Sequence, residues 1–104
     1  GDGGIPQVHI YIDSACHLTV MPTQIDAPAG TALAVTYHNH SVDFAADVWG
    51  SYGGGYLGLT TGAEWTDRYP HCADRTAHTD TADISIAGGA TTMCPSFRFK
   101  INCL

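Results

Sequence analysis

The chain is short of positive charge. Of its 104 residues, four are Lys or Arg and ten are Asp or Glu, which gives a formal net charge of −6 at pH 7. Binding to phosphate groups requires a basic stripe or patch, and the sequence has none. Nucleic acid is therefore not an expected partner.

Long apolar runs and catalytic signatures are also missing. No stretch of about 18 apolar residues occurs, so no membrane insertion is expected, and we see no charged-then-apolar leader. The sequence contains no Gly-x-Ser-x-Gly, no His-Glu-x-x-His and no phosphate loop. Asp43 and Asp47 could form a glycosidase-like pair, but nothing around them supplies the apolar environment that a catalytic acid requires. We therefore expect a protein that is not an enzyme, with a glycan-acting hydrolase as an alternative.

The four cysteines form no Cys-x-x-Cys pair. An even number spread along the chain favours two disulfides in an oxidising compartment over a zinc site or a redox pair. Three pairings are open among Cys16, Cys72, Cys94 and Cys103, and four buried free thiols are the alternative. The expected location, secreted or at the cell surface, depends on these cysteines alone.

Apolar residues recur with a period of two, and no window shows a helical period. Short β-branched or aromatic segments separated by Pro, Gly, Asn and Asp predict one all-β domain over residues 1–104, an antiparallel β-sandwich with jelly-roll or Greek-key connections. The expected strands are 8–12, 18–21, 31–37, 56–59, 63–65, 83–86 and 96–101, with turns at 28–30 and 88–89. The expected inward residues are Ile10, Ile12, Leu18, Val20, Leu33, Val35, Tyr37, Leu57, Leu59, Trp65, Ile84, Ile86, Phe97, Phe99 and Ile101.

Residues 46–59 combine a carboxylate, aromatic rings and three consecutive glycines. We interpret this stretch as a sugar site in which Asp47 accepts hydrogen bonds from hydroxyls and Trp49 or Tyr52 covers the apolar face of the ring. Gly54 or Gly55 would donate a backbone N–H through a positive φ angle. A mobile hairpin tip is the alternative interpretation.

Residues 38–41 offer further candidates. Asn39 or His38 would complete the rim of the sugar site, although Asn39-His40-Ser41 is also an N-glycosylation acceptor, and an occupied Asn39 could not contact sugar. His38 and His40 would share one strand face, as a zinc site or, more simply, as a surface pair.

The stretch resembles the legume lectins, in which one loop ends in Ala-Asp and a later loop reads Gly-Gly-aromatic-Leu-Gly-Leu. Ala46-Asp47 and residues 54–59 match both parts in order, and Trp49-Gly50 is similar to the Trp-Gly pair of galectins. The resemblance implies a concanavalin- or galectin-like sandwich that binds galactose-type sugars or related hexosides on cell-surface glycans and glycoproteins. Hemagglutinating activity would require several copies, as in a homo-oligomer.

Legume lectins also hold calcium and a transition metal near the sugar loop. Glu64, Asp67, Asp74 and His78 follow in a comparable order, but the asparagine that ligates calcium in the family has no counterpart here. We therefore expect no cofactor, with calcium or manganese on these four residues as the alternative.

A third possibility is a small secreted module that binds or inhibits another protein. It would use the aromatic residues Trp49, Tyr52 and Tyr56 as its contact surface.

Overall fold

The computed structural model describes residues 6–28, 30–50, 55–72, 78–88, 92–94 and 97–104. Within these ranges the chain forms strands and no helix, so the prediction of an all-β protein is confirmed. No helix of the described part is long and apolar enough to cross a membrane. The strands are β1 Gln7–Ile12, β2 Leu18–Met21, β3 Gln24–Ala27, β4 Thr31–Asn39, β5 Ala46–Gly50, β6 Gly55–Leu59, β7 Glu64–Cys72, β8 His78–Gly88, β9 Thr92–Met93 and β10 Phe97–Cys103.

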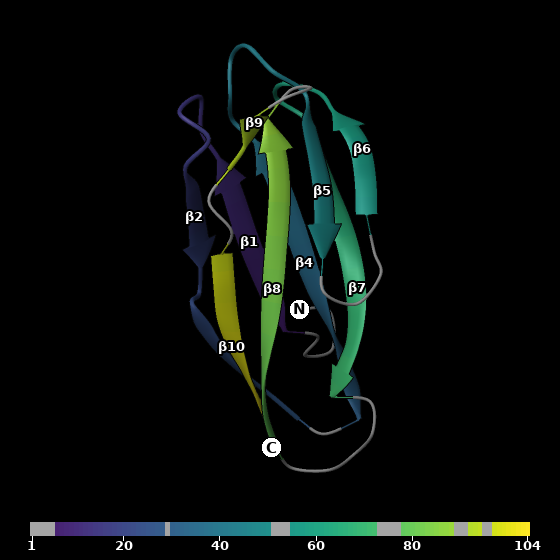
Figure 1. Cartoon of the computed structure of the whole chain (residues 1–104). Helices are drawn as coiled ribbons and strands as arrows, with labels where there is room; N and C mark the ends of the chain where they lie inside the picture. Colours follow the sequence, from purple (N-terminus) through teal and green to yellow (C-terminus); the bar gives the residue numbers. More distant parts are fainter. Residues whose placement is uncertain (1–5, 29, 51–54, 73–77, 89–91, 95–96) are drawn as a thin grey trace.

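The strands form two sheets that pack face to face as a sandwich (Figure 1). The first sheet has the order β2-β1-β4-β7, and the second has the order β3-β10-β8-β5-β6 with β9 paired to β8. Most pairs are antiparallel, but β1 pairs with β4 and β3 with β10 in parallel. Parallel neighbours need a crossover, which β2 and β3 provide between β1 and β4. The sandwich is therefore mixed rather than antiparallel throughout.

The core lies between the sheets and follows the two-residue period of the strands. On β1, the side chains of Val8, Ile10 and Ile12 are fully buried, and on β5 those of Ala46 and Val48 are too. The expected core residues that are buried are Ile10, Ile12, Leu18, Val20, Leu33, Val35, Tyr37, Leu59 and Ile101. Trp65 is partly buried against this core. For four further expected core residues, on β8 and β10, the structure describes only the backbone: Ile84, Ile86, Phe97 and Phe99.

Leu57 is the exception among the expected core residues. Its side chain is 70% exposed, so the prediction that it faces inward is wrong. It lies on β6, the last strand of the second sheet, where the pairing with β5 shifts by one residue. A one-residue shift breaks the alternation of inward and outward side chains on which the prediction was based.

Two disulfides connect the layers, as the cysteine content predicts. Cys72 ends β7 of the first sheet and Cys103 ends β10 of the second, and their Cα atoms are 5.5 Å apart. Cys16 follows β1 and is bonded to Cys94, which follows β9. The structure thereby chooses one of the three pairings that the sequence leaves open.

Candidate functional site

Asp47 and Trp49 lie on the outer face of the second sheet, on β5. Their neighbours Ala46 and Val48 are fully buried, and side chains alternate along a strand, so Asp47 and Trp49 point away from the core. The indole is 42% exposed and Asp47 is half-buried. Residues two apart on a strand are separated by about 7 Å, so the carboxylate and the indole share one surface patch.

A bulge in β6 holds the Asp47 carboxylate in place. Ala46 pairs with Leu59 but Val48 pairs with Tyr56, which leaves one extra residue on β6. Gly58 in this bulge has a φ of 75°, and its N–H donates a 2.7 Å hydrogen bond to Asp47 Oδ1. The described residues provide no partner for the second carboxylate oxygen. Gly58 was missed as a site residue, although a glycine inside a strand pattern is the signal of such a bulge.

Gly55 has a different role from the predicted one. It lies in β6 opposite Trp49, and it does not have a positive φ angle, so the prediction is wrong for Gly55. A Cβ at this position would lie 3.1 Å from Val48 O and 3.7 Å from Trp49 Cδ1. The missing side chain lets the indole lie close to the neighbouring strand. Gly54 and Tyr52 lie outside the described residues.

Replacing Gly58 by alanine should destabilise the folded protein, although there is space for a methyl group at this position. A Cβ there would meet nothing within 4 Å, so the cost of Gly58→Ala is conformational. We expect a loss of about 1–2 kcal/mol in the free energy of unfolding, because the left-handed region is unfavourable for residues with a Cβ. Urea titration followed by circular dichroism measures it. An alanine variant as stable as wild type would show that the bulge is not required.

His38 does not complete this patch, contrary to prediction. Tyr37 on β4 is fully buried, so the next residue, His38, points outward from the first sheet. Asp47 and Trp49 point outward from the second sheet. His38 and the predicted sugar-binding pair are therefore on opposite faces of the sandwich.

Asn39 is also not available as a rim residue, because it is fully buried and its polar atoms are bonded within the protein. Its Nδ2 donates to Phe44 O at 2.9 Å and to Leu59 O at 2.8 Å. Its Oδ1 accepts from Ser41 N at 3.0 Å and from Ser41 Oγ at 2.6 Å. These bonds join the connection after β4 to the end of β6. The folded structure thus leaves no room for a glycan on Asn39.

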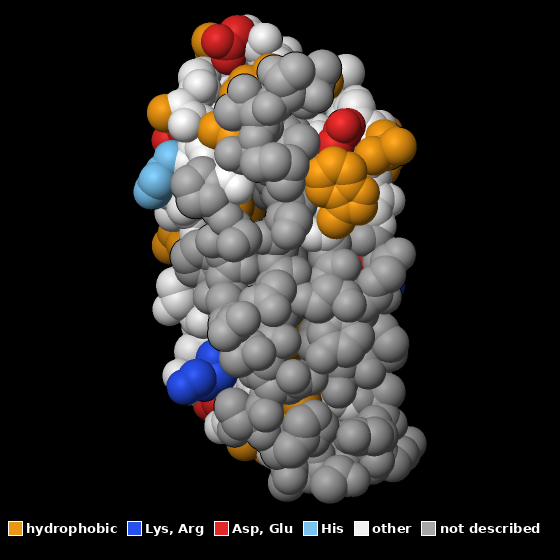
Figure 2. Space-filling model, viewed as in Figure 1, with side chains coloured by type: hydrophobic (Ala, Val, Ile, Leu, Met, Phe, Trp, Pro, Cys, Tyr) orange, Lys and Arg blue, Asp and Glu red, His pale blue; other side chains and the backbone are white. Residues whose placement is uncertain are grey.

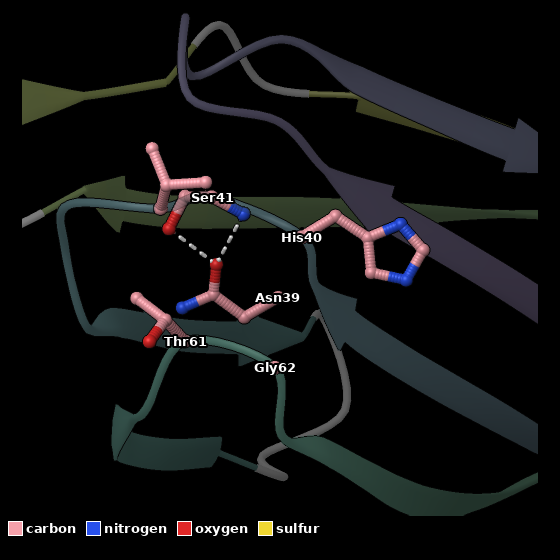
Figure 3. A pocket seen from close by; sticks show the side chains of 6 residues that line it. Asn39, His40, Ser41, Thr61 and Gly62 are labelled. Atoms are coloured by element: carbon pink, nitrogen blue, oxygen red, sulfur yellow. Dashed lines mark hydrogen bonds between the residues drawn. The ribbon is translucent and has the colours of Figure 1, made fainter.

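An open hollow of about 460 Å³ lies at this end of the sandwich (Figure 3). It is lined by Asn39, His40, Ser41, Val42, Thr61 and Gly62. Figure 3 shows the Asn39 carbonyl group turned to Ser41 within its wall. The side-chain amide of Asn39 is already bonded, so the hollow presents chiefly the exposed side chains of His40, Val42 and Thr61.

Of the four alternative metal ligands, the structure describes the side chains of Glu64 and Asp67, and it does not bring these two together. Glu64 and Asp67 are three apart on β7, and Asp67 pairs with inward-facing Val35 whereas Glu64 contacts outward-facing His38. The two carboxylates therefore lie on opposite faces of the first sheet and cannot share an ion. His78 is on β8 of the second sheet, with its side chain outside the described set, and Asp74 lies outside the described residues.

Tyr56 closes one edge of the sandwich. Its ring lies 5.5 Å from that of Trp65 on β7, which in turn stacks at 5.5 Å on the buried Tyr37. This row of rings connects the edge strand β6 to the first sheet. Tyr56 remains 42% exposed, so its outer edge is still accessible to a ligand.

Comparison with known proteins does not identify a family for the chain. No protein-family model matches the chain, and no curated protein is similar to it. Among solved structures, it is similar to a chain from the cryo-EM structure of a heme-copper terminal oxidase dimer, with 12% identity and a TM-score of 0.49. The match covers 99% of this chain and 67% of that one. A likeness this low carries no argument about function.

Proposed function

We propose that the protein is a non-catalytic carbohydrate-binding module whose site is the outer face of β5. The observation that carries the proposal is the fixed Asp47 carboxylate beside an exposed indole. One carboxylate oxygen is held by Gly58 N–H, and the other, which has no partner among the described residues, can accept hydrogen bonds from sugar hydroxyls. Trp49 offers an apolar surface to the C–H face of the ring.

The ligand class follows from these two groups. An oriented acceptor and a flat apolar surface fit a hexoside that presents adjacent hydroxyls and one apolar face, such as galactose or a related sugar. Because the patch is open, affinity for one sugar is low, and useful avidity for cell-surface glycoproteins requires several copies, for example a homo-oligomer. Hemagglutination would follow from such an arrangement. The two disulfides support a secreted or cell-surface location.

Asp47→Asn should abolish glycan binding without changing the fold. The amide keeps the size of the side chain but replaces one acceptor oxygen by a donor and removes the charge. The measurement is retention of labelled protein on a glycan array, with release by free sugar. Asp43→Asn, which alters an exposed acid in the connection before β5, is the matched control and should bind as wild type.

Excess EDTA should leave this binding intact, because the bulge and the Gly58 hydrogen bond fix Asp47 without an ion. For the Asp47→Asn variant, retention of the same glycans as wild type would show that Asp47 is not part of the site. Binding lost in EDTA and restored by calcium or manganese would contradict the metal-independent mechanism.

A protein-binding or inhibitory module is the second candidate, favoured by the exposed apolar residues of β6. Leu57 and Tyr56 are 70% and 42% exposed on this edge strand. Figure 2 shows hydrophobic side chains gathered beside an acidic one over β5 and β6. Leu57→Lys distinguishes the two functions: it should disrupt a protein interface but leave glycan retention unchanged.

A further inference from the structure

Five polar and aromatic side chains gather on the outer face of the first sheet, opposite the proposed sugar site. They are His9 and Tyr11 on β1, His38 on β4, His40 directly after β4, and Glu64 on β7, and we name them the histidine cluster. The parallel pairing of β1 and β4 sets Tyr11 opposite His38, and the pairing of β4 and β7 sets His38 opposite Glu64. Three strands thus contribute to one row.

His38 is the centre of the cluster. Its Nε2 lies 2.9 Å from His9 Nδ1, and its Nδ1 lies 3.2 Å from Glu64 Oε2. The Tyr11 ring stacks on the His38 ring at 4.6 Å between centroids and 14° between planes. The side chain of His38 is 16% exposed. The imidazole ring of His38 is therefore held by contacts at both of its edges and on one face.

The contact with Glu64 leaves Nε2 as the nitrogen of His38 that can bind a metal. A His38 that donates Nδ1–H to Glu64 has its lone pair on Nε2, the nitrogen that lies 2.9 Å from His9 Nδ1. A neutral imidazole nitrogen of this kind is a common metal ligand.

We propose that His9 Nδ1 and His38 Nε2 bind one Cu²⁺ ion. Metal–nitrogen bonds of about 2.0–2.1 Å give a nitrogen separation of about 2.9 Å when the angle at the metal is about 90°. That angle is typical of the tetragonal geometry of Cu²⁺, which also forms the most stable complexes of the divalent first-row metals. Glu64, hydrogen-bonded to the far nitrogen of His38, is the outer carboxylate that usually orients a metal-bound imidazole.

Water completes the coordination. Among the described residues, no three His, Cys, Asp or Glu side chains meet at one point, so the two imidazoles are the protein ligands. On binding, the His9 proton moves from Nδ1 to Nε2, and the ion lies to one side of the line that joins the two nitrogens, at the apex of the angle of about 90°. The surface position leaves the remaining coordination sites open to solvent.

Calorimetric titration of the folded protein with CuCl₂, in a buffer that does not bind copper, tests the proposal. We expect one Cu²⁺ per chain, and binding weakened on the order of 100-fold in His9→Gln and in His38→Gln. Glu64→Gln should weaken binding about tenfold, because it removes only the outer carboxylate. His17→Gln is the matched control and should bind as wild type, since His17 is a surface histidine beside Asp13 on another part of the chain.

Electron paramagnetic resonance of the wild-type copper complex gives a readout that does not depend on the variants folding. It should show hyperfine coupling to two imidazole nitrogens in a tetragonal site. Failure of the wild type to bind micromolar Cu²⁺ would overturn the proposal. So would wild-type affinity in both His9→Gln and His38→Gln, or a spectrum without imidazole coupling.

Discussion

Reduction of both disulfides should lower the free energy of unfolding by roughly 4–8 kcal/mol, the sum of two bridges that each contribute roughly 2–4 kcal/mol. Domains of this size are stable by only about 5–15 kcal/mol, so the reduced chain should be largely unfolded on mild heating. Thermal and urea unfolding, with and without a phosphine reductant, measure the loss. The oxidised protein should also be lighter than the reduced chain by about four hydrogen atoms, and native protein with four titratable thiols would contradict both disulfides.

The two bridges can be compared one at a time. Cys16 and Cys94 are separated by 78 residues in the sequence, and Cys72 and Cys103 by 31. Because the entropy removed from the unfolded chain rises with the length of the closed loop, the first bridge should contribute more, by about 1 kcal/mol. Paired Cys→Ser variants of each bridge test this order.

The second large effect is expected at Asn39. Asn39→Asp keeps the shape of the side chain but sets an oxygen against the carbonyl groups of Phe44 and Leu59, which now accept from Nδ2. Because the site is fully buried, we expect a loss of roughly 3–5 kcal/mol in the free energy of unfolding. Urea titration measures it.

Ser41→Ala provides the milder comparison within the same network. It removes the hydroxyl that donates to Asn39 Oδ1 but leaves the Ser41 N–H bond, so a loss of about 1 kcal/mol is expected. If Asn39→Asp unfolds at the same urea concentration as wild type, the network does not stabilise this end of the sandwich.

The strands that sequence predicts correctly are those with a clear two-residue period. The segment of β1 is the plainest case, since Val8, Ile10 and Ile12 alternate with polar residues and are all fully buried. β3 was not predicted because its four residues, Gln24–Ala27, contain little apolar alternation. β5 is absent from the expected strands, although Ala46 and Val48 alternate with Asp47 and Trp49.

The candidate site, like the fold, can be predicted from the sequence only in part. Asp47 and Trp49 share a face because they are two apart on one strand, and this parity can be read from the sequence. That His38 belongs to the other sheet depends on strand order, which is decided by the tertiary fold. The same holds for His9, which is 29 residues from His38 and meets it only through the parallel pairing of β1 with β4. No local pattern signals that contact.

The central claim, that the outer face of β5 binds sugar, is tested most directly by amide chemical-shift mapping during titration with the glycan that the array retains most strongly. The account predicts saturable shifts of the Gly58 backbone N–H and the Trp49 indole N–H, with little change at Thr36 and His38 on the opposite face. Saturable shifts confined to Thr61 and Gly62 in the open hollow beside Asn39, or confined to the first sheet, would contradict this claim.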